Sequence, residues 1–315
     1  MQTDCAKYDI SPNETLEIAQ SLYVNPFSAT TYPRTDTPYL TDGLAEDIEE
    51  TVSHLVKIDT FSNWSNVLDL KKRTKAWNDK KVKVHYGIIP TVSALDFGRL
   101  VDKQKAVYML VAKRYLLQFM PDYVYDNSVL SIKIGNLSFK ATCNIAKSLG
   151  WRAVEDSEQS DEVTLPALDK GQKLGVKDVR VMEKTTRRPP RYTQATLAAA
   201  MVNIADEIDD AALKKSLSDK DGIGTVTTRP AIIADLIKSG LLVEEKRQLK
   251  PSRRFEKFMN HIPKQMKEPA NAALWERGFE AVKEGQITVE QFIQFQEKFV
   301  RSSVKELEKV FSEIK

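Results

Sequence analysis

The sequence predicts an α+β protein in which a helical segment is followed by a β-rich segment and then by a second helical segment. Apolar residues recur at helical spacing up to about residue 118. Two runs of strand composition, residues 123–134 and 137–143, then flank Gly135-Asn136, a dipeptide that favours a two-residue hairpin turn. Helical spacing returns beyond the stiff basic stretch 187–191. A chain of 315 residues with this organisation is expected to form two or three domains.

The first predicted helix has a defined start and a defined end. Ser11 precedes Glu14 by three residues and Pro12 occupies the first helical position, which together are typical of a capping box. Asn25-Pro26 ends this helix, because the residue before a proline avoids helical backbone angles. The chain then runs directly into a polar stretch that carries the most informative residues of the sequence.

Two more helices are predicted in the first segment, from about residue 41 to 55 and over residues 103–119, from the same apolar spacing. Residues 59–81 are polar and lysine-rich, and they predict no particular element. Within the β-rich segment a third strand is predicted over residues 173–182. Residues 155–164 are acidic and polar, which indicates a solvated loop.

The second helical segment contains the pattern of a winged helix. Thr193 is expected to cap a first helix, and Thr228 is expected to cap a second helix over residues 229–239. Gly240 fits the end of that helix because glycine readily adopts left-handed backbone angles. Residues 241–249 then read as a short hairpin, so that helix, turn, helix and hairpin follow one another.

Composition excludes several classes of protein without naming a function. The formal net charge is only +3, so any affinity for nucleic acid must come from local clusters of basic residues. Cys5 and Cys143 lie far apart, which is typical neither of a zinc site nor of a disulfide framework. The sequence contains no apolar run long enough to cross a membrane. A reduced, cytosolic protein is therefore expected.

A tyrosine and an arginine stand close together in residues 28–37. Tyr32 precedes Arg34 by two residues, among several hydroxyl side chains. A free tyrosine side chain has a pKa of about 10 and is a poor nucleophile unless positive charge favours the phenolate. An arginine supplies that charge, and its planar fork fits a phosphate. This arrangement predicts a site that holds and attacks a phosphodiester; the alternative is a surface loop with Pro33 as its turn residue.

The stretch Thr31-Tyr32-Pro33-Arg34-Thr35-Asp36, followed by Leu40, resembles the active-site signature of type IA DNA topoisomerases, closest to the topoisomerase III branch. His85, in Val84-His85-Tyr86-Gly87-Ile88-Ile89-Pro90-Thr91, is similar to the first histidine of a second motif of that family. The resemblance implies that Tyr32 is the nucleophile, that Arg34 neutralises charge on the phosphoryl oxygens, and that His85 donates a hydrogen bond near the scissile phosphate. Thr35 and Asp36 are expected to orient the loop.

Two later stretches continue the resemblance, in the family's order. Residues 189–197 are close to its Pro-Pro-Arg-Tyr-Thr-Glu-Ala-Thr-Leu run, and residues 222–233 to its Gly-x-Gly-Thr-Pro-Ala-Thr-Arg-Ala-x-Ile-Ile run. Arg191 offers a cation and Tyr192 a ring on which a base can stack. Thr228 and Arg229 are expected to contact the backbone of single-stranded DNA at a helix N-terminus.

The resemblance also implies an architecture. By analogy, residues 1–118 form the domain that carries the tyrosine, residues 119–190 supply an arch of antiparallel strands, and residues 191–315 form a helical, winged-helix-containing base domain. In this family a preceding Toprim domain holds Mg²⁺ on acidic residues, and Tyr32 lies too near the N-terminus for one to precede it. Asp219-Lys220-Asp221 lies in a turn and is rejected as a metal site. No metal is expected to bind to this chain itself.

The implied function is DNA strand passage through a transient 5′-phosphotyrosyl bond, once a Toprim domain complements this chain. The expected partners are single-stranded DNA and that Toprim domain, in a monomer located in the bacterial cytoplasm at the nucleoid. A non-catalytic module that binds single-stranded DNA is the alternative. Conjugative relaxases and tyrosine recombinases are disfavoured, because the three histidines build no metal cluster and no His-x-x-Arg element precedes Tyr32.

Overall fold

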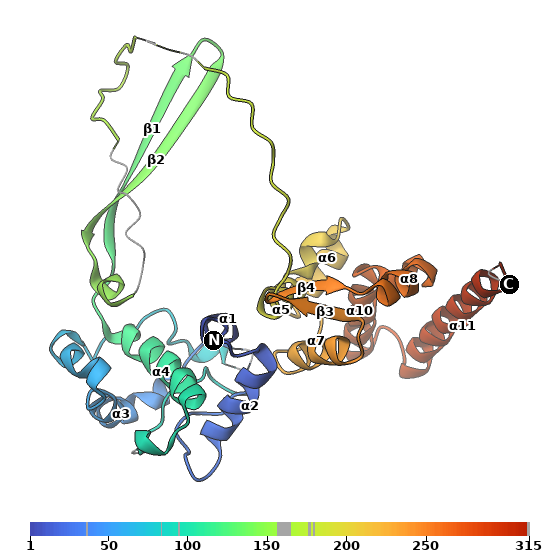
Figure 1. The fold of residues 1–315 in the computed structure, drawn as a ribbon, viewed down its shortest axis with the longest axis horizontal. Coiled ribbons are helices and arrows are strands. Elements are labelled where there is room, and N and C mark those ends of the chain that lie inside the picture. The colour runs from blue at the N-terminus through green and yellow to red at the C-terminus, as the bar shows by residue number, and fades with distance from the viewer. Residues whose placement is uncertain are drawn as a thin grey trace. The chain divides into compact units, whose positions relative to one another are not determined.

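The structure, a computed structural model, describes residues 1–35, 37–82, 84–93, 95–155, 165–175, 178 and 180–313 (Figure 1). The chain divides into two compact units, each built from stretches that are distant in sequence. Unit 1 combines Met1–Pro38, Leu95–Leu110 and Pro190–Lys315, and unit 2 combines Tyr39–Ala94 and Val111–Pro189. The division into domains 1–118, 119–190 and 191–315 stays a prediction.

The N-terminal part of unit 1 contains helices α1 (Gln2–Cys5) and α2 (Pro12–Tyr23). The predicted cap of α2 is confirmed, because the Glu14 backbone N–H donates to Ser11 Oγ at 3.2 Å and Pro12 occupies the first turn. Helix α4 (Asp102–Leu116) begins in unit 1 beside α2. Its first turn is attached by Lys103 Nζ, 2.5 Å from Glu14 Oε1, and by Gln104 Nε2, which donates to Ser21 Oγ at 3.0 Å. One contact is made in the first turn of α2 and the other near its last turn, so α4 is attached to α2 along the length of that helix.

The C-terminal part of unit 1 is helical with one short hairpin, as the sequence predicts. Strands β3 (Leu242–Glu245) and β4 (Gln248–Pro251) pair in antiparallel fashion and follow α7 (Thr228–Lys238). Gly240, with φ of 70°, ends α7 by donating its N–H to the Ile237 carbonyl at 2.9 Å. The elements are α5 (Gln194–Val202), α6 (Ala211–Ser218), α7 (Thr228–Lys238), β3 (Leu242–Glu245), β4 (Gln248–Pro251), α8 (Arg253–His261), α9 (Lys264–Lys267), α10 (Ala270–Lys283) and α11 (Val289–Glu313).

Two apolar clusters stabilise this part of unit 1. Ala198 of α5, Ile233 of α7 and Leu249 of β4 form the first, which is the core of the winged-helix pattern. Leu217 of α6 and Ala273 of α10 belong to the second cluster. Helix α7 also contacts α2, so the N-terminal helix and the winged-helix pattern pack together within one unit. Burial of these side chains contributes roughly 25 cal/mol per Å² of apolar surface.

Unit 2 has a helical part and a long β-ribbon. Its helical part contains the 3₁₀ helices η2 (Asp42–Asp47) and η3 (Asp59–Val67), helix α3 (Ile48–Leu55), the second half of α4, and the 3₁₀ helix η6 (Leu117–Phe119). Phe61, Leu116 and Phe119 are buried in this part. The helix predicted over residues 103–119 is therefore confirmed as α4 followed by η6. Residues 59–81, for which no element was predicted, contain η3 and a loop that contacts the start of the ribbon.

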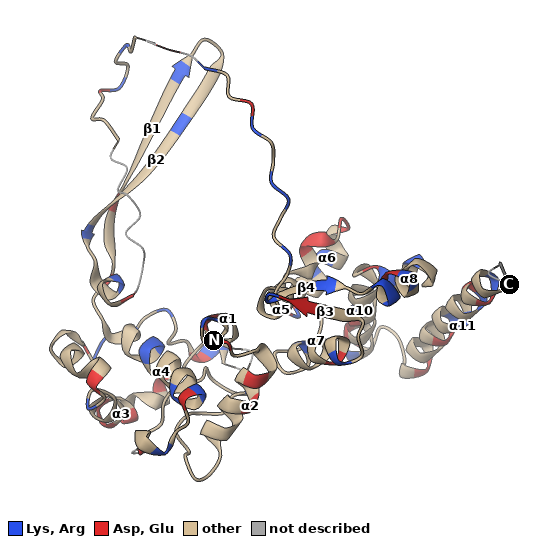
Figure 2. Ribbon diagram, in the orientation of Figure 1, with Lys and Arg blue, Asp and Glu red and all other residues tan. Residues whose placement is uncertain are grey.

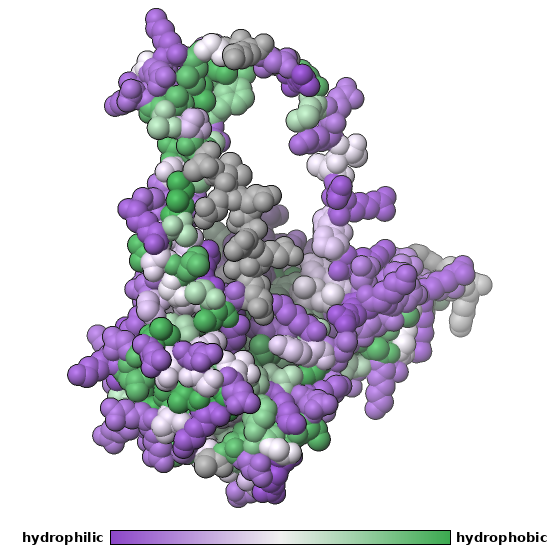
Figure 3. Space-filling view, turned by 60° about the vertical axis from the view of Figure 1, so that its left-hand side comes forward, coloured by the Kyte–Doolittle hydropathy of each residue, from purple (hydrophilic) through white to green (hydrophobic). Residues whose placement is uncertain are grey.

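Strands β1 (Val124–Ile134) and β2 (Leu137–Ser148) form the predicted hairpin, which Figure 1 shows as a long ribbon rising from the end of α4. Gly135 has a φ of 57° and makes the turn possible. Strand β2 is five residues longer than predicted. Because side chains alternate between faces and Ile132 pairs with Phe139, one face of the ribbon is apolar. Figure 3 shows apolar side chains gathered towards its tip.

The third strand predicted over residues 173–182 is not formed by those of its residues that the structure describes. Apolar and polar residues alternate around Leu174 as they do in a strand. A strand also needs a second strand to which its backbone can hydrogen-bond. Val181 illustrates the outcome, with 93% of its surface exposed. The acidic loop predicted over residues 155–164 lies, apart from Glu155, outside the described residues. Figure 2 shows Lys and Arg recurring along the extended connector that leads to Arg191.

Candidate active site

Tyr32 lies just beyond α2 and is positioned by the end of that helix. The chain turns back after the helix, where the Ser28 N–H donates to the Val24 carbonyl at 3.1 Å and the Ala29 N–H to the Leu22 carbonyl at 2.7 Å. The Tyr32 ring then meets the ring of Tyr23, the last residue of α2, edge to face with centroids 5.5 Å apart. Tyr32 is half-buried. The ring is thus held by an aromatic contact, which contributes about 1 kcal/mol.

Arg34 follows on the same loop and its side chain is exposed. Pro33, which lies between the two residues, is buried. The half-buried Tyr32 side chain and the exposed Arg34 side chain therefore lie in different environments. Beyond Arg34 the loop closes on itself, since the Thr37 N–H donates to Thr35 Oγ1 at 3.3 Å. The orienting role expected of Thr35 is compatible with this local turn. Asp36, expected to act with it, lies outside the described residues.

Two other tyrosines of the chain have the opposite environment. Tyr108 and Tyr115, both on α4, are 3% exposed. Burial raises the pKa of Tyr108 to about 12. Burial, followed by the negative charge of Asp47, raises the pKa of Tyr115 to about 12. Because attack on phosphorus requires the phenolate, both side chains are unsuited to act as nucleophiles.

His85 belongs to unit 2, whereas Tyr32 and Arg34 belong to unit 1. Its side chain is exposed. Two residues further on, the Gly87 N–H donates to the Tyr39 carbonyl at 2.8 Å, which fixes the extended segment that carries the histidine. Lys81 Nζ donates to Tyr39 Oη at 2.9 Å and stabilises the same region. The segment therefore presents His85 on a restrained backbone.

Thr228 lies at the start of α7, but the capping arrangement differs from the one predicted. The Thr225 N–H donates to Thr228 Oγ1 at 2.7 Å, and the Thr228 N–H donates to Thr225 Oγ1 at 3.1 Å. Thr225 is thus the capping residue, and Thr228 completes a reciprocal box three residues later. Helix α5 starts with the same arrangement between Thr193 and Thr196, which confirms the predicted cap there. Thr228 remains exposed and able to meet a ligand.

Arg229 has an internal role that the sequence did not predict. It is 5% exposed, and its Nε donates to the Ile223 carbonyl at 2.8 Å. Its Nη2 donates to the carbonyls of Gly224, at 3.0 Å, and of Asp221. Burial lowers the pKa of this guanidinium, although arginine stays charged at neutral pH. In the structure Arg229 holds the loop before α7, and its predicted contact with DNA stays a prediction.

Replacement of Arg229 by methionine is expected to destabilise unit 1 by about 3 kcal/mol, because three backbone carbonyls of the loop lose the buried guanidinium that donates to them. The urea midpoint of unfolding measures this loss. Arg191→Met is the matched control, since Arg191 is exposed and its replacement should change the midpoint little. Equal midpoints for the two variants would contradict the internal role of Arg229.

Arg191 and Tyr192 lie immediately before α5. Both are exposed, with 53% of the Tyr192 surface accessible. The Tyr192 carbonyl accepts a hydrogen bond from the Leu249 N–H of β4 at 2.7 Å, which attaches this stretch to the winged-helix core. Their contacts with DNA stay predictions. The exposed ring on a fixed backbone is the arrangement that stacking on a base requires.

The sequence reasoning missed Tyr23 and Thr225. The signal for Tyr23 was its position at the end of a predicted helix nine residues before Tyr32, although only the folded loop brings the rings together. Within the residues that the structure describes, no three His, Cys, Asp or Glu side chains gather into a group that could hold a metal ion. Among the described helices, none combines the length and the apolar composition needed to cross a bilayer.

Comparison with known proteins identifies the family. Residues 1–294 match a family model described as DNA topoisomerase. The chain is 34% identical to DNA topoisomerase 3 of Haemophilus influenzae over 301 residues, covering 93% of this chain and 46% of that protein. It is 32% identical to DNA topoisomerase 3 of Bacillus subtilis over 322 residues, covering 98% of this chain and 44% of that protein.

The fold is similar to that of full-length topoisomerase I from Thermotoga maritima, with a TM-score of 0.59 and 21% identity over 99% of this chain and 48% of that one. The chain thus spans about half the length of the relatives it matches. The matched range includes every candidate site residue, from Tyr32 to Arg229. The chain therefore belongs to the type IA DNA topoisomerase family, and its relatives are of the topoisomerase III kind.

Proposed function

We propose that this chain supplies the nucleophile for strand passage of DNA. Tyr32 Oη attacks the phosphorus of a single-stranded segment, forms a phosphotyrosyl ester with the 5′-phosphate of the downstream fragment, and releases the 3′-hydroxyl of the upstream fragment. The phenol loses its proton and the departing 3′-oxygen gains one. The ester keeps the number of phosphoester bonds constant, so the 3′-hydroxyl can reverse the reaction without ATP. In the cell this DNA would be that of the bacterial nucleoid.

The observation that carries the proposal is the placement of Tyr32 and Arg34 on one loop, beside the last residue of α2. Arg34 is exposed, so its guanidinium is accessible to the phosphoryl oxygens and can offset charge that develops on them. A preorganised donor of this kind contributes about 3–4 kcal/mol to the transition state. His85 would add a hydrogen bond from unit 2. Thr228 would contact the DNA backbone, with Arg229 holding the loop before it.

Mg²⁺ would reduce the negative charge of the DNA phosphates at the break. We infer that this ion comes with a Toprim domain, as membership of the type IA topoisomerase family implies. The residues of this chain that act on the phosphate are then cationic or hydrogen-bond donors rather than carboxylates. The whole activity is therefore expected from a complex of this chain with a Toprim domain, one copy of each.

The isolated chain is expected to bind single-stranded oligonucleotides but to form no covalent adduct and to relax no supercoiled plasmid. Fluorescence anisotropy measures the binding, and denaturing gels of a labelled oligonucleotide measure the adduct. Addition of a Toprim domain from a related topoisomerase, with Mg²⁺, should then produce the adduct. Relaxation of negatively supercoiled DNA by this chain alone would contradict the proposed division of labour. Binding with no adduct under any complementation would favour a purely DNA-binding module.

A further inference from the structure

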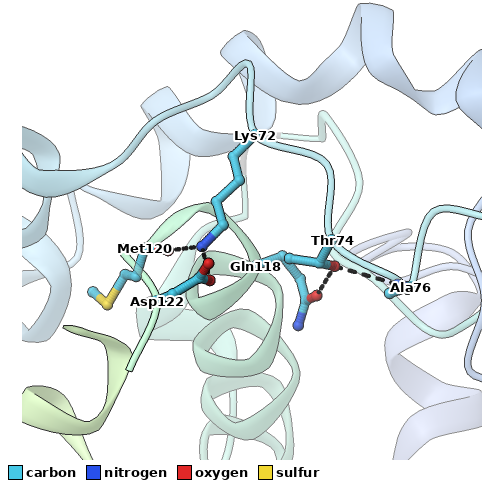
Figure 4. Close-up of polar contacts among 6 residues, drawn as sticks. All are labelled: Lys72, Thr74, Ala76, Gln118, Met120 and Asp122. Atoms are coloured by element: carbon cyan, nitrogen blue, oxygen red, sulfur yellow. Dashed lines mark hydrogen bonds and ion pairs between the residues drawn. The ribbon is translucent and has the colours of Figure 1, made fainter. Parts of the chain in front are cut away.

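The root of the β-ribbon is attached to a polar, lysine-rich loop of unit 2. The root, residues 117–122, joins α4 to β1, and the loop, residues 69–76, follows η3. Lys72 Nζ donates to the Met120 carbonyl and to Asp122 Oδ1, the latter at 2.6 Å (Figure 4). Beside this contact, Thr74 Oγ1 donates to Gln118 Oε1 at 2.6 Å. We call Lys72, Met120 and Asp122 the lysine clamp.

The loop is organised to present Lys72. The Lys72 N–H donates to the Asp69 carbonyl at 3.0 Å, and the Lys71 N–H donates to Asp69 Oδ1 at 3.0 Å. The Asp69 N–H in turn donates to the Phe119 carbonyl at 2.8 Å. The Lys72 side chain is only 20% exposed, whereas Asp122 is 77% exposed. A partly desolvated ammonium that reaches a backbone carbonyl and a carboxylate gives a stronger and more directional contact than an exposed ion pair.

The lysine clamp acts where both strands of the ribbon leave the helical part of unit 2. The Trp151 N–H, just after β2, donates to the Pro121 carbonyl at 2.9 Å. Gly150 has a φ of 45°, and a Cβ there would lie 2.2 Å from the Asp122 carbonyl oxygen. The outgoing and returning chains are therefore in close contact at residues 121–122. Lys72, from the loop 69–76, contacts Met120 and Asp122 at the place where these two chains meet.

A small tilt at this point is amplified along the ribbon. Strand β1 contains 11 residues, and at about 3.3 Å per residue it is roughly 36 Å long. A tilt of about 10° at the root would then displace the tip by roughly 6 Å, which is larger than the spacing of two strands. The ribbon is a sheet of two strands, and no further described strand pairs with it. We therefore expect the contacts at its root to set its direction.

We propose that Lys72 is a positioning residue that keeps the ribbon in one direction relative to the helical part of unit 2. This role rests on the proposed function, because strand passage needs a ribbon that holds its direction while DNA moves past it. Lys72 touches neither the phosphate nor Tyr32 in this role. Removal of its ammonium should leave DNA cleavage intact and impair strand passage.

The first test measures the direction of the ribbon in the isolated chain and needs no enzymatic activity. Nitroxide labels on Asn136→Cys at the ribbon turn and on exposed Asn66→Cys in η3 report the distance between the two parts by pulsed electron paramagnetic resonance. Lys72→Met should broaden the distance distribution at least twofold. Lys71→Met is the matched control, because Lys71 is exposed on the same loop. Lys72→Arg should keep the narrow distribution, since it retains a cation of similar length.

Two outcomes of this first test would overturn the proposal. One is a distribution for Lys72→Met that matches that of Lys71→Met. The other is an unchanged distance distribution for Asp122→Asn. This variant removes the carboxylate charge that pairs with Lys72, and because Asp122 is exposed it should fold. It therefore tests the proposal even if Lys72→Met does not fold. Asp122→Asn is expected to give a width between those of the parent chain and Lys72→Met.

The second test separates strand passage from cleavage in the complex with a Toprim domain. For Lys72→Met, plasmid relaxation should fall about tenfold while the yield of covalent adduct on a short oligonucleotide changes less than twofold. A parallel fall in both readouts would mean that Lys72 is only a structural residue and would overturn the proposal. If Tyr32 forms no adduct at all, the proposed function fails, while the distance measurements still decide what Lys72 does.

Discussion

Replacement of Tyr32 by phenylalanine is expected to eliminate the covalent DNA adduct of the Toprim-complemented chain, with a loss of at least about 10⁴-fold in the rate of cleavage. The change removes only the hydroxyl that attacks phosphorus. The edge-to-face contact with Tyr23 needs the ring alone and should persist. Binding of single-stranded DNA and the thermal midpoint should therefore stay close to those of the parent chain. Denaturing gels of a labelled oligonucleotide, quenched over time, measure the rate.

Tyr23→Phe is the matched control for this experiment. Tyr23 is the aromatic neighbour of Tyr32, and its hydroxyl has no assigned role in the reaction. The variant should form the adduct at a rate within about twofold of the parent chain, because the ring contact is retained. An undiminished adduct with Tyr32→Phe, or an equal loss with Tyr23→Phe, would contradict the assignment of Tyr32 as the nucleophile.

Replacement of Arg34 by alanine is expected to slow cleavage by about 10²- to 10³-fold, the usual effect of removing one preorganised donor from a charged transition state. Affinity for single-stranded DNA should fall much less, since one cation among many contributes little to ground-state binding. Arg34 is exposed, so the fold should be unaffected. Single-turnover cleavage rates and anisotropy titrations at the same salt concentration separate the two effects.

Arg34→Lys is the informative companion variant. Lysine keeps the charge but loses the planar fork, so cleavage should recover only in part, to a rate between those of Arg34→Ala and the parent chain. If Arg34→Ala lowered affinity and cleavage by the same factor, Arg34 would be a binding residue rather than a group that acts in the transition state.

Much of the fold was predictable because its signals are local. Ser11, Pro12 and Glu14 specify the start of α2 within four residues of sequence, and Gly135 specifies the ribbon turn. Such features depend on backbone angles and nearby hydrogen bonds, which a sequence states directly. The third strand, which the described residues of 173–182 do not form, shows the limit of this reasoning. The alternation of apolar and polar residues around Leu174 is typical of a strand with one buried face. A strand also needs a neighbouring strand to pair with, and tertiary structure decides whether there is one.

The candidate site was predictable in its nucleophile and less so in its supporting residues. Tyr32 and Arg34 are only two residues apart in sequence, so their proximity needs no tertiary information. Arg229 was expected to contact the DNA backbone, yet its guanidinium donates hydrogen bonds to carbonyls of the loop before α7. The sequence does not show that this side chain is buried. Lys72 lies 48 residues from Met120 in the chain, and its polar, lysine-rich surroundings carried no sign of that contact.

The most direct test of the central claim is the identification of the residue that carries DNA after cleavage. The adduct formed by the Toprim-complemented chain on a short oligonucleotide is digested with a protease and a nuclease, and the modified peptide is sequenced by mass spectrometry. The account predicts a nucleotide attached through its 5′-phosphate to Tyr32. Attachment to another tyrosine, or through a 3′-phosphate, would contradict it.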